Sequence, residues 1–249
     1  MDHLGYCDLL AVEVERFASV IDCQPTGVAV PGCPGWCLGD LTKHLGTVHR
    51  WAEHLVRVRA QGRISHQDMG LGAPEESADW LRAGGEALLA TLRSADPGAP
   101  MWAWGADQHV RFWSRRQLHE TLVHRMDAEL ALGRVPEASP AVAADATDEF
   151  LANLPSAARF SPKVAELRGN GTRLVFRATD TERGWWVTLQ PGGFEVSPAP
   201  TGPPDATLAG PAVTLLLVLY RRLPVTEDGI VVTGERAAVE RWLANSALE

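Results

Sequence analysis

The segment RRQLHETLVHRMDAE, residues 115–129, carries the side chains best suited to metal chemistry. At about 100° of rotation per helical residue, Glu120 and His124 project from one helix face on successive turns. Asp127, three residues further on, stays on that face. His119 and His124 are five apart and fall on different faces, which excludes the HExxH arrangement of zinc proteases. One carboxylate and one imidazole on a shared face are good ligands for a borderline divalent metal.

A third ligand is expected from the histidines of residues 38–59. His44, His49 and His54 are spaced by five, so they spiral around a helix and do not share a face. His44 lies among leucines and valine where a core-facing residue would sit, so it is the preferred third ligand. His49 and His54 are expected to be partly exposed, as is His119.

His44, Glu120 and His124 together would form a three-ligand metal site in a helical bundle, with a position left open for water or substrate. Asp127 is expected to orient His124 or another ligand from outside the metal's immediate surroundings. The simpler alternatives are a solvated Glu120–His124 pair on a helix face and a hydrogen-bonded core histidine at position 44.

Four amphipathic helices would position these side chains. The recurrence of apolar residues predicts helices over residues 2–21, 38–59, 75–94 and 114–132. Helices of these lengths favour an antiparallel four-helix bundle with longer connections.

After Pro136 the pattern becomes that of a smaller α+β domain. The expected elements are a helix over 141–154, strands over 165–168, 173–178, 185–190 and 194–197, a helix over 211–222, a strand over 230–232 and a helix over 235–247. Asn170–Gly171 is interpreted as the hairpin turn between the first two strands. The predicted fold class is therefore α+β with two domains: residues 1–140 as the bundle with the metal site, and residues 141–249 as the α+β domain.

Composition narrows the classes of function. The net charge is −8 and no basic stripe is present, so nucleic acid is not expected as a partner. No apolar run approaches the ~20 residues of a membrane span, so no membrane partner is expected either. The first residues carry acids within their apolar stretch and lack a basic start, which predicts a cytoplasmic protein. The cysteines are expected to be reduced and to serve packing; they are Cys7, Cys23, Cys33 and Cys37.

Four stretches together resemble one family. They are CPGWCLGDLTKHLGTVHRWAEHL (33–55), WAWG (102–105), FWSRRQLHETLVHRMDAE (112–129) and PDATLAGPAVTLLLVLYRRLP (204–224). This set resembles the actinobacterial mycothiol-dependent maleylpyruvate isomerase family over nearly the whole chain. The resemblance implies a DinB-like N-terminal four-helix bundle and a smaller α+β domain related to sterol-carrier-protein folds.

The resemblance also implies a ligand set and a co-substrate. The family's metal ligands fall on His44, Glu120 and His124, the residues that the spacing favours. Family members hold a divalent metal there, usually zinc, and use it to activate the thiol of mycothiol, because a metal lowers a thiol's pKa. An arginine of the family falls on Arg222, beside Arg221, where a guanidinium could clamp a substrate carboxylate. A structural salt bridge is an equal alternative for either arginine.

The sequence thus predicts a metal-dependent, thiol-using isomerase or S-transferase that acts on a small electrophilic substrate. Arg222 and Asp127 are its predicted catalytic residues, mycothiol its co-substrate, and a monomer or small homo-oligomer its state. Two alternatives stay open: a non-catalytic small-molecule-binding protein on the same fold, and a metal-dependent hydrolase. Cys37 and Met126 replace the family's more usual Thr or Ser and Trp, which could reshape the pocket.

Overall fold

The computed structural model describes residues 1–65, 69–70, 72–197, 199–200 and 202–247. The chain divides after Pro136 into two compact units, residues 1–136 and 137–249. Among the described residues, no helix is both long and apolar enough to cross a membrane.

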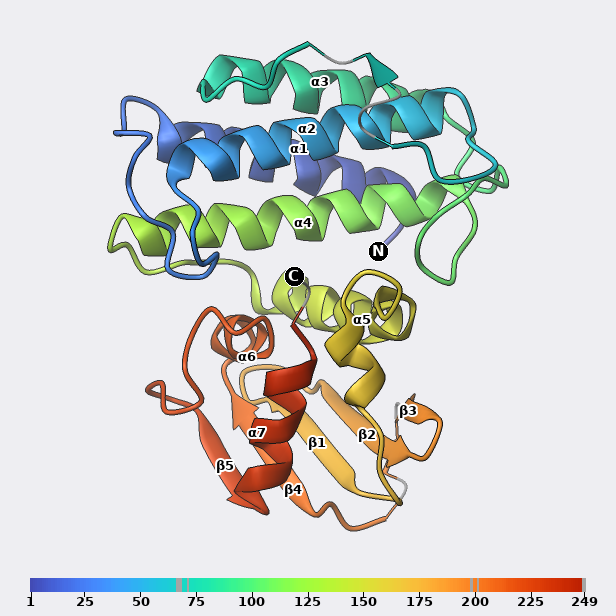
Figure 1. Cartoon of the computed structure of the whole chain (residues 1–249), viewed down its shortest axis with the longest axis vertical. Helices are drawn as coiled ribbons and strands as arrows, with labels where there is room; N and C mark the ends of the chain where they lie inside the picture. The colour runs from blue at the N-terminus through green and yellow to red at the C-terminus, as the bar shows by residue number, and fades with distance from the viewer. Residues whose placement is uncertain (66–68, 71, 198, 201, 248–249) are drawn as a thin grey trace. The chain divides into compact units, whose positions relative to one another are not determined.

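Four helices form the first unit and lie side by side in Figure 1. They are α1 (His3–Ile21), α2 (Leu38–Arg57), α3 (Ala78–Ser94) and α4 (Val110–Ala131). The predicted four-helix region is confirmed, although α3 begins at Ala78 and not at residue 75, and α4 at Val110 and not at residue 114. The later start of α3 follows from its cap, because the Ser77 hydroxyl accepts a hydrogen bond from the backbone N–H of Trp80.

Close helix packing in this unit depends on small residues. α1 packs against α3 and α4, and α2 packs against α3 and α4. Gly46 on α2 lies directly under the ring of Trp80, where a Cβ atom would come within 2.1 Å of a ring carbon. A larger residue at position 46 would therefore force α2 and α3 apart.

The helix α4 is buried on nearly every side. Of its 22 residues, 17 are buried, and several of these carry charge. A helix that is buried all round while carrying ionisable groups must pair or coordinate them, since an isolated buried charge is strongly unfavourable. The charged residues of α4 are therefore candidates for ion pairing or metal coordination.

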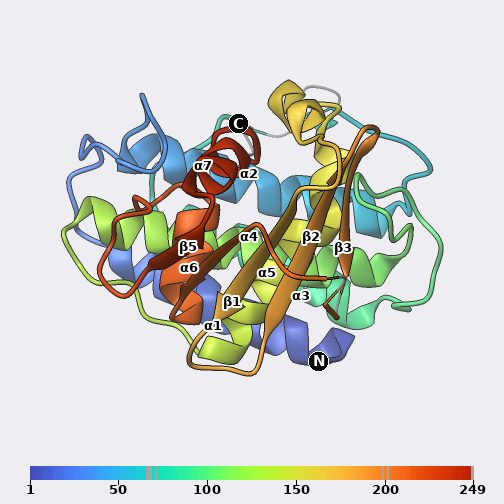
Figure 2. The ribbon, with the colours of Figure 1, turned by 90° about the horizontal axis from the view of Figure 1, so that it is seen from below.

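The second unit is a mixed five-stranded sheet with helices. Its elements are α5 (Pro140–Ala157), the 3-10 helix η2 (Pro162–Glu166), β1 (Arg173–Ala178), β2 (Gly184–Gln190), β3 (Gly193–Ser197), β4 (Ala206–Gly210), α6 (Ala212–Leu219), β5 (Val231–Gly234) and α7 (Arg236–Asn245). The strand order is β3-β2-β1-β4-β5, with β1 and β4 parallel and the other pairs antiparallel. Figure 2 shows this sheet with β3 and β5 at its edges. The predicted α+β class is confirmed.

Two local predictions in this unit are wrong, and one strand was not predicted at all. Residues 165–168 form no strand, because Pro162 opens the 3-10 helix η2 and the chain leaves it at Leu167, which is buried. Asn170–Gly171 precedes β1, and the β1–β2 hairpin turns at residues 179–183 instead. The strand β4 was not predicted: it is buried at four of five positions and so lacks the alternation that marks a half-exposed strand.

Candidate metal centre

Side chains from α2 and α4 converge at one point in the first unit. The Nε2 atom of His44 on α2 lies 3.3 Å from Oε1 of Glu120 on α4, and the Nε2 atom of His124 lies 3.3 Å from the same oxygen. One potential ligand atom from each of the three residues lies within 4.8 Å of the others. The structure therefore brings together the three residues that the sequence predicts as ligands, and their assignment to a metal stays a prediction.

The spacing of the three donor atoms can be compared with what a tetrahedral metal needs. Ligand atoms at about 2.1 Å from a tetrahedral zinc ion lie roughly 3.4 Å from one another. The two separations of 3.3 Å between Glu120 Oε1 and the histidine Nε2 atoms match this value. Two imidazole nitrogens and one carboxylate oxygen are also a donor set that suits a borderline divalent ion. The residues present therefore fit such an ion.

The ring of His124 is oriented by Asp127. The Nδ1 atom of His124 lies 2.9 Å from Oδ2 of Asp127, whose side chain is completely buried. A carboxylate accepts a hydrogen bond from Nδ1–H, which leaves the lone pair on Nε2, the atom that faces Glu120. The predicted role of Asp127 in orienting His124 therefore has the geometry that it requires.

The carboxylate of Glu120 is oriented by Arg116, one turn earlier on α4. The Arg116 Nη2 atom donates to Glu120 Oε2 over 2.7 Å, and the arginine side chain is only 4% exposed. With Oε2 held in this way, Oε1 is the oxygen that faces both histidines. Sequence reasoning missed Arg116, although its i,i+4 spacing from Glu120 is a signal for such an ion pair.

Electrostatics in the cluster favour a charged pair in the metal-free protein. Burial by itself would raise the pKa of Glu120, but the Arg116 guanidinium and the hydrogen bonds to His124 and His44 hold that pKa well below its usual range. Burial by itself would lower the pKa of His124, but hydrogen bonds with Asp127, Cys33 and Glu120 raise it well above the usual range. A proton on His124 therefore supplies the positive charge that the cluster requires.

The remaining ligand candidate, His44, is the accessible member of the cluster. Its side chain is 34% exposed, against 11% for His124. The ring of Trp36 packs on one side of it, with ring centroids 4.9 Å apart, and the ring of His124 lies edge-on at 5.1 Å. The cluster thus opens toward the surface beside His44.

Cys33 also reaches the cluster, which sequence reasoning missed. Its Sγ atom lies 3.6 Å from Asp127 Oδ2, and Cys33, His124 and Asp127 form a second group of mutually close donor atoms. Cys33 and Asp127 are 94 residues apart in the chain. Spacing within a helix carries no information on such a contact, and the only available signal was the position of Cys33 in the CPGW motif.

His49 and His119 are not among the residues that form the cluster in the described part of the chain. His49 and His119 are completely buried, so the expectation that they are partly exposed is wrong. The Nε2 atom of His49 lies 2.9 Å from the hydroxyl of Thr121, and burial lowers the pKa of His49 to about 3, which keeps it neutral. His119 lies with its ring edge-on to Tyr6, at 6.3 Å between centroids. Both positions turn inward because α2 and α4 are covered on more than one side.

In the second unit, the guanidinium of Arg222 lies against the backbone two residues earlier in the chain. Its Nη1 atom donates to the carbonyl of Tyr220 over 3.0 Å, and Arg221 adopts a left-handed backbone with φ of +60°. The role of Arg222 as a clamp for a substrate carboxylate stays a prediction.

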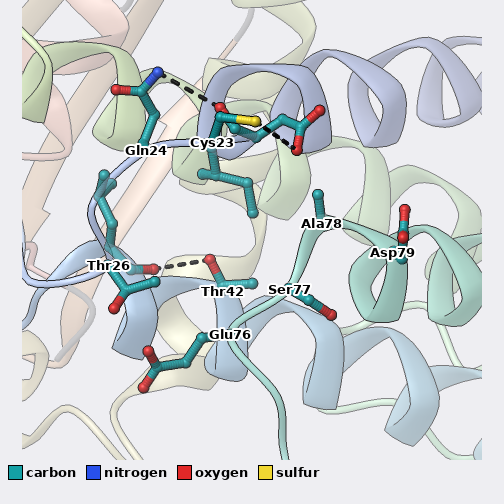
Figure 3. A pocket seen from close by; sticks show the side chains of 11 residues that line it. Cys23, Gln24, Thr26, Thr42, Glu76, Ser77, Ala78 and Asp79 are labelled. Atoms are coloured by element: carbon teal, nitrogen blue, oxygen red, sulfur yellow. Dashed lines mark hydrogen bonds between the residues drawn. The ribbon is translucent and has the colours of Figure 1, made fainter.

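A cavity of about 260 Å³ lies elsewhere in the first unit, between the end of α1 and the starts of α2 and α3. Figure 3 shows its polar lining, which includes Cys23, Thr26, Glu76 and Asp79. None of the three ligand candidates is among the described residues that line it. The cavity is therefore separate from the cluster of His44, Glu120 and His124.

The fold and cluster define a class of two-unit proteins in which a helical bundle carries a His/Glu/His cluster and an α+β sheet unit follows. Residues 7–129 match the family model described as the mycothiol maleylpyruvate isomerase N-terminal domain, and residues 141–241 match the MDMPI C-terminal domain. The chain therefore belongs to the mycothiol maleylpyruvate isomerase family, as its sequence motifs predicted.

Solved structures agree with this assignment. The crystal structure of the mycothiol-dependent maleylpyruvate isomerase matches with a TM-score of 0.57 and 15% identity, covering 94% of this chain and 95% of that one. A histidine-to-alanine mutant of that isomerase matches with the same TM-score and coverage at 14% identity. At these identities the likeness shows the shared fold alone. No curated protein sequence matches the chain.

Proposed function

We propose that this protein is a divalent-metal-dependent enzyme that uses a low-molecular-weight thiol, mycothiol, to isomerise or conjugate a small electrophilic substrate in the cytoplasm. The observation that carries the proposal is the approach of two histidine Nε2 atoms to one oxygen of Glu120, each over 3.3 Å. Family membership supports the choice of thiol and of reaction type.

In this proposal His44, Glu120 and His124 hold the ion, with zinc as the expected metal. When bound, such an ion supplies Lewis acidity that lowers the pKa of a thiol, so that thiolate is present at neutral pH. Three protein groups keep the ligands in place: Arg116 on Glu120, Asp127 on His124 and Trp36 on His44. The half-exposed side of His44 is where a thiol and a substrate would enter.

The chemistry of an isomerase then needs no net proton or electron transfer. A thiolate adds to the β-carbon of a double bond conjugated to a carbonyl, and the displaced electron pair moves onto the carbonyl oxygen. The former double bond is now single and rotates; the electron pair returns, and the thiolate leaves with its original charge. In an S-transferase the adduct instead takes up one proton at the α-carbon and is released as the product.

An activated double bond of this kind is found in small keto acids and related carboxylates, so the proposed substrate carries a carboxylate. Arg222 is the proposed clamp for that group, by a bidentate pairing of guanidinium with carboxylate. The hydrogen bond from Arg222 to the Tyr220 carbonyl would be exchanged for the substrate. Replacing Arg222 by Lys is expected to raise KM for an acidic substrate more than it lowers kcat, because Lys lacks the planar fork.

The decisive first measurement is the metal content of the protein purified without a metal-affinity tag, beside a His124→Ala variant. Near-stoichiometric zinc or another divalent ion in the wild type, lost in the variant, would support the proposed centre. No metal after reconstitution with zinc would refute the enzyme mechanism and favour a non-catalytic binding protein on the same fold.

A second experiment separates the reaction classes. The metal-loaded protein is incubated with mycothiol and a panel of small cis-configured unsaturated keto acids. Geometric isomerisation without loss of free thiol identifies an isomerase, and stoichiometric loss of thiol identifies a transferase. Turnover of a hydrolysable substrate that persists without any thiol would instead identify a metal-dependent hydrolase.

A further inference from the structure

The segment between α1 and α2 is a closed hairpin, residues 28–38, with the CPGW motif at its tip. Backbone hydrogen bonds join Val30 N–H to the Trp36 carbonyl over 2.9 Å and Leu38 N–H to the Val28 carbonyl over 2.9 Å. An isolated antiparallel bridge pairs Ala29 with Cys37. The hairpin is therefore fixed at its base by the same bonds that hold a small sheet.

The tip of the hairpin is a tight turn whose residues suit its geometry. The Trp36 N–H donates to the Cys33 carbonyl over 3.0 Å, and the two residues between them are Pro34 and Gly35. Gly35 has a φ of +86°, which is the value that position i+2 of a type II turn requires, and Pro is favoured at position i+1. This turn fixes the distance between Cys33 and Trp36.

Those two residues contact the two histidines of the metal cluster by different routes. Trp36 packs its ring on His44 at 4.9 Å. The Cys33 thiol lies 3.6 Å from Asp127 Oδ2, and the same Oδ2 atom is 2.9 Å from Nδ1 of His124. The hairpin thus contacts His44 through Trp36 and reaches His124 through Asp127.

The chemistry of Cys33 at this position is that of a hydrogen-bond donor. Its Sγ atom lies 3.6 Å from Asp127 Oδ2, within reach of a sulfur hydrogen bond. The neutral S–H group can donate to Oδ2.

We propose that Cys33 is a positioning residue for metal binding: its thiol donates to Asp127, Asp127 holds the ring of His124, and the hairpin thereby tunes the affinity of the cluster for a divalent ion. The inference rests on the proposed function, because it assigns a role toward the same metal centre. It adds the CPGW hairpin to that centre.

The test measures zinc affinity by competition with a chromophoric chelator, with purified proteins and no substrate. Cys33→Ala is expected to weaken zinc binding by roughly three- to ten-fold, below the ~10- to 100-fold that loss of a group bonded directly to a ligand produces. Cys33→Ser, which keeps a donor at a shorter reach, is expected to fall between the wild type and Cys33→Ala. Cys23→Ala is the matched control: it removes an exposed thiol from the same connection between helices and is expected to leave the affinity unchanged.

Further measurements distinguish the positioning role of Cys33 from a loss of structure and from direct coordination of the metal. Thermal unfolding of the metal-free proteins shows whether each variant folds, and ¹H–¹⁵N spectra of the histidine rings report whether His124 keeps its proton on Nδ1. If Cys33→Ala does not fold, Cys33→Ser carries the test. In cobalt-loaded wild type, no sulfur-to-cobalt charge-transfer absorption from Cys33 is expected.

The outcomes separate this inference from the proposed function. A wild type that binds no divalent ion refutes the metal centre and, with it, the role of Cys33. A wild type that binds zinc, with Cys33→Ala and Cys23→Ala equal in affinity, refutes only the positioning role. A charge-transfer band that disappears in Cys33→Ser would make Cys33 a ligand and overturn the inference as well.

Discussion

Two faces of the helix α4 carry buried charges, and they handle them in different ways. On the face toward α1, the Arg125 guanidinium donates to Glu13 over 2.8 Å and to Glu129 over 2.6 Å, and Arg16 adds a second cation at 3.3 Å from Glu13. On the face toward α2, Glu120 meets His44 and His124. The first cluster sets two carboxylates against two permanent cations, and its charges balance.

The second cluster contains two carboxylates, those of Glu120 and Asp127, but one guanidinium, that of Arg116. When His124 is neutral and donates its Nδ1–H to Asp127, the lone pair on Nε2 faces the Glu120 oxygen over 3.3 Å and is repelled by it. A proton on His124 or a metal ion between the three groups removes this repulsion. The comparison teaches that two carboxylates with one guanidinium and two imidazoles suit an added cation, whereas carboxylates matched in number by guanidinium groups form a structural ion-pair network.

The largest effect on zinc affinity is expected from His124→Ala. This change removes one proposed ligand and the anchor to Asp127, so zinc affinity should fall at least 100-fold, beyond the ~10- to 100-fold range for groups that only support a ligand. Metal analysis after dialysis checks it. His49→Ala, a buried histidine outside the cluster, is the comparison variant, and equal metal loss in both would contradict the assignment.

Substitutions on the face of α4 toward α1 should lower the stability of the protein and leave its metal binding unchanged. Arg125→Met leaves Glu13 and Glu129 buried without their shared guanidinium, and the free energy of unfolding should fall by about 3–5 kcal/mol. Arg16→Met removes the outer, 39% exposed cation of the same network and should cost under about 1 kcal/mol. Denaturant unfolding measures both. Equal losses for the two variants would show that burial does not decide the effect.

A smaller change in affinity is expected from Asp127→Asn. The amide keeps the shape of the side chain but not its charge, so the orientation and basicity of His124 are weakened and zinc affinity should fall by about 10- to 100-fold. Chelator competition measures the change. Asp40→Asn, which alters a carboxylate at the start of α2 outside the cluster, should leave zinc affinity as it is. An Asp127→Asn protein with wild-type affinity would refute the orienting role.

The smallest expected effect is on the pH dependence of the metal-free protein. The lowered pKa of Glu120 stabilises the fold above its ordinary value of 4.5, and this contribution is lost as the pH falls through the lowered pKa. The raised pKa of His124 stabilises the fold below its ordinary value of 6.5, and this contribution is lost as the pH rises through the raised pKa. The cluster thus contributes most between pH 4.5 and 6.5.

Zinc should reverse the loss of stability at higher pH, because metal binding requires a neutral His124 and releases its proton. Zinc affinity should therefore increase as the pH rises through the raised pKa of His124. Calorimetry in buffers of different ionisation enthalpy measures the proton released. The His124→Ala protein should show neither the loss of stability at high pH nor the proton release; a wild type that releases no proton would contradict the charged state of His124.

Much of the helical unit could be predicted because its signals are local. The four helices follow from apolar periodicity, and the shared face of Glu120 and His124 follows from a spacing of four in a helix. The sheet unit was predicted less well: β4 went unrecognised because a strand buried on both faces does not alternate. Neighbouring strands also determine where a short strand forms, and β4 pairs with β1 from a distant part of the chain.

The sequence by itself determined the family, the helices and the three candidate ligands, because motifs and helical spacing are properties of neighbouring residues. Only the tertiary structure decided that His44 meets Glu120 across 76 residues, that His49 turns into the core, and that Cys33 reaches Asp127. The physical reason is that periodicity fixes which face of a helix a side chain occupies. Which residue that face then meets depends on how whole helices and the hairpin pack against one another.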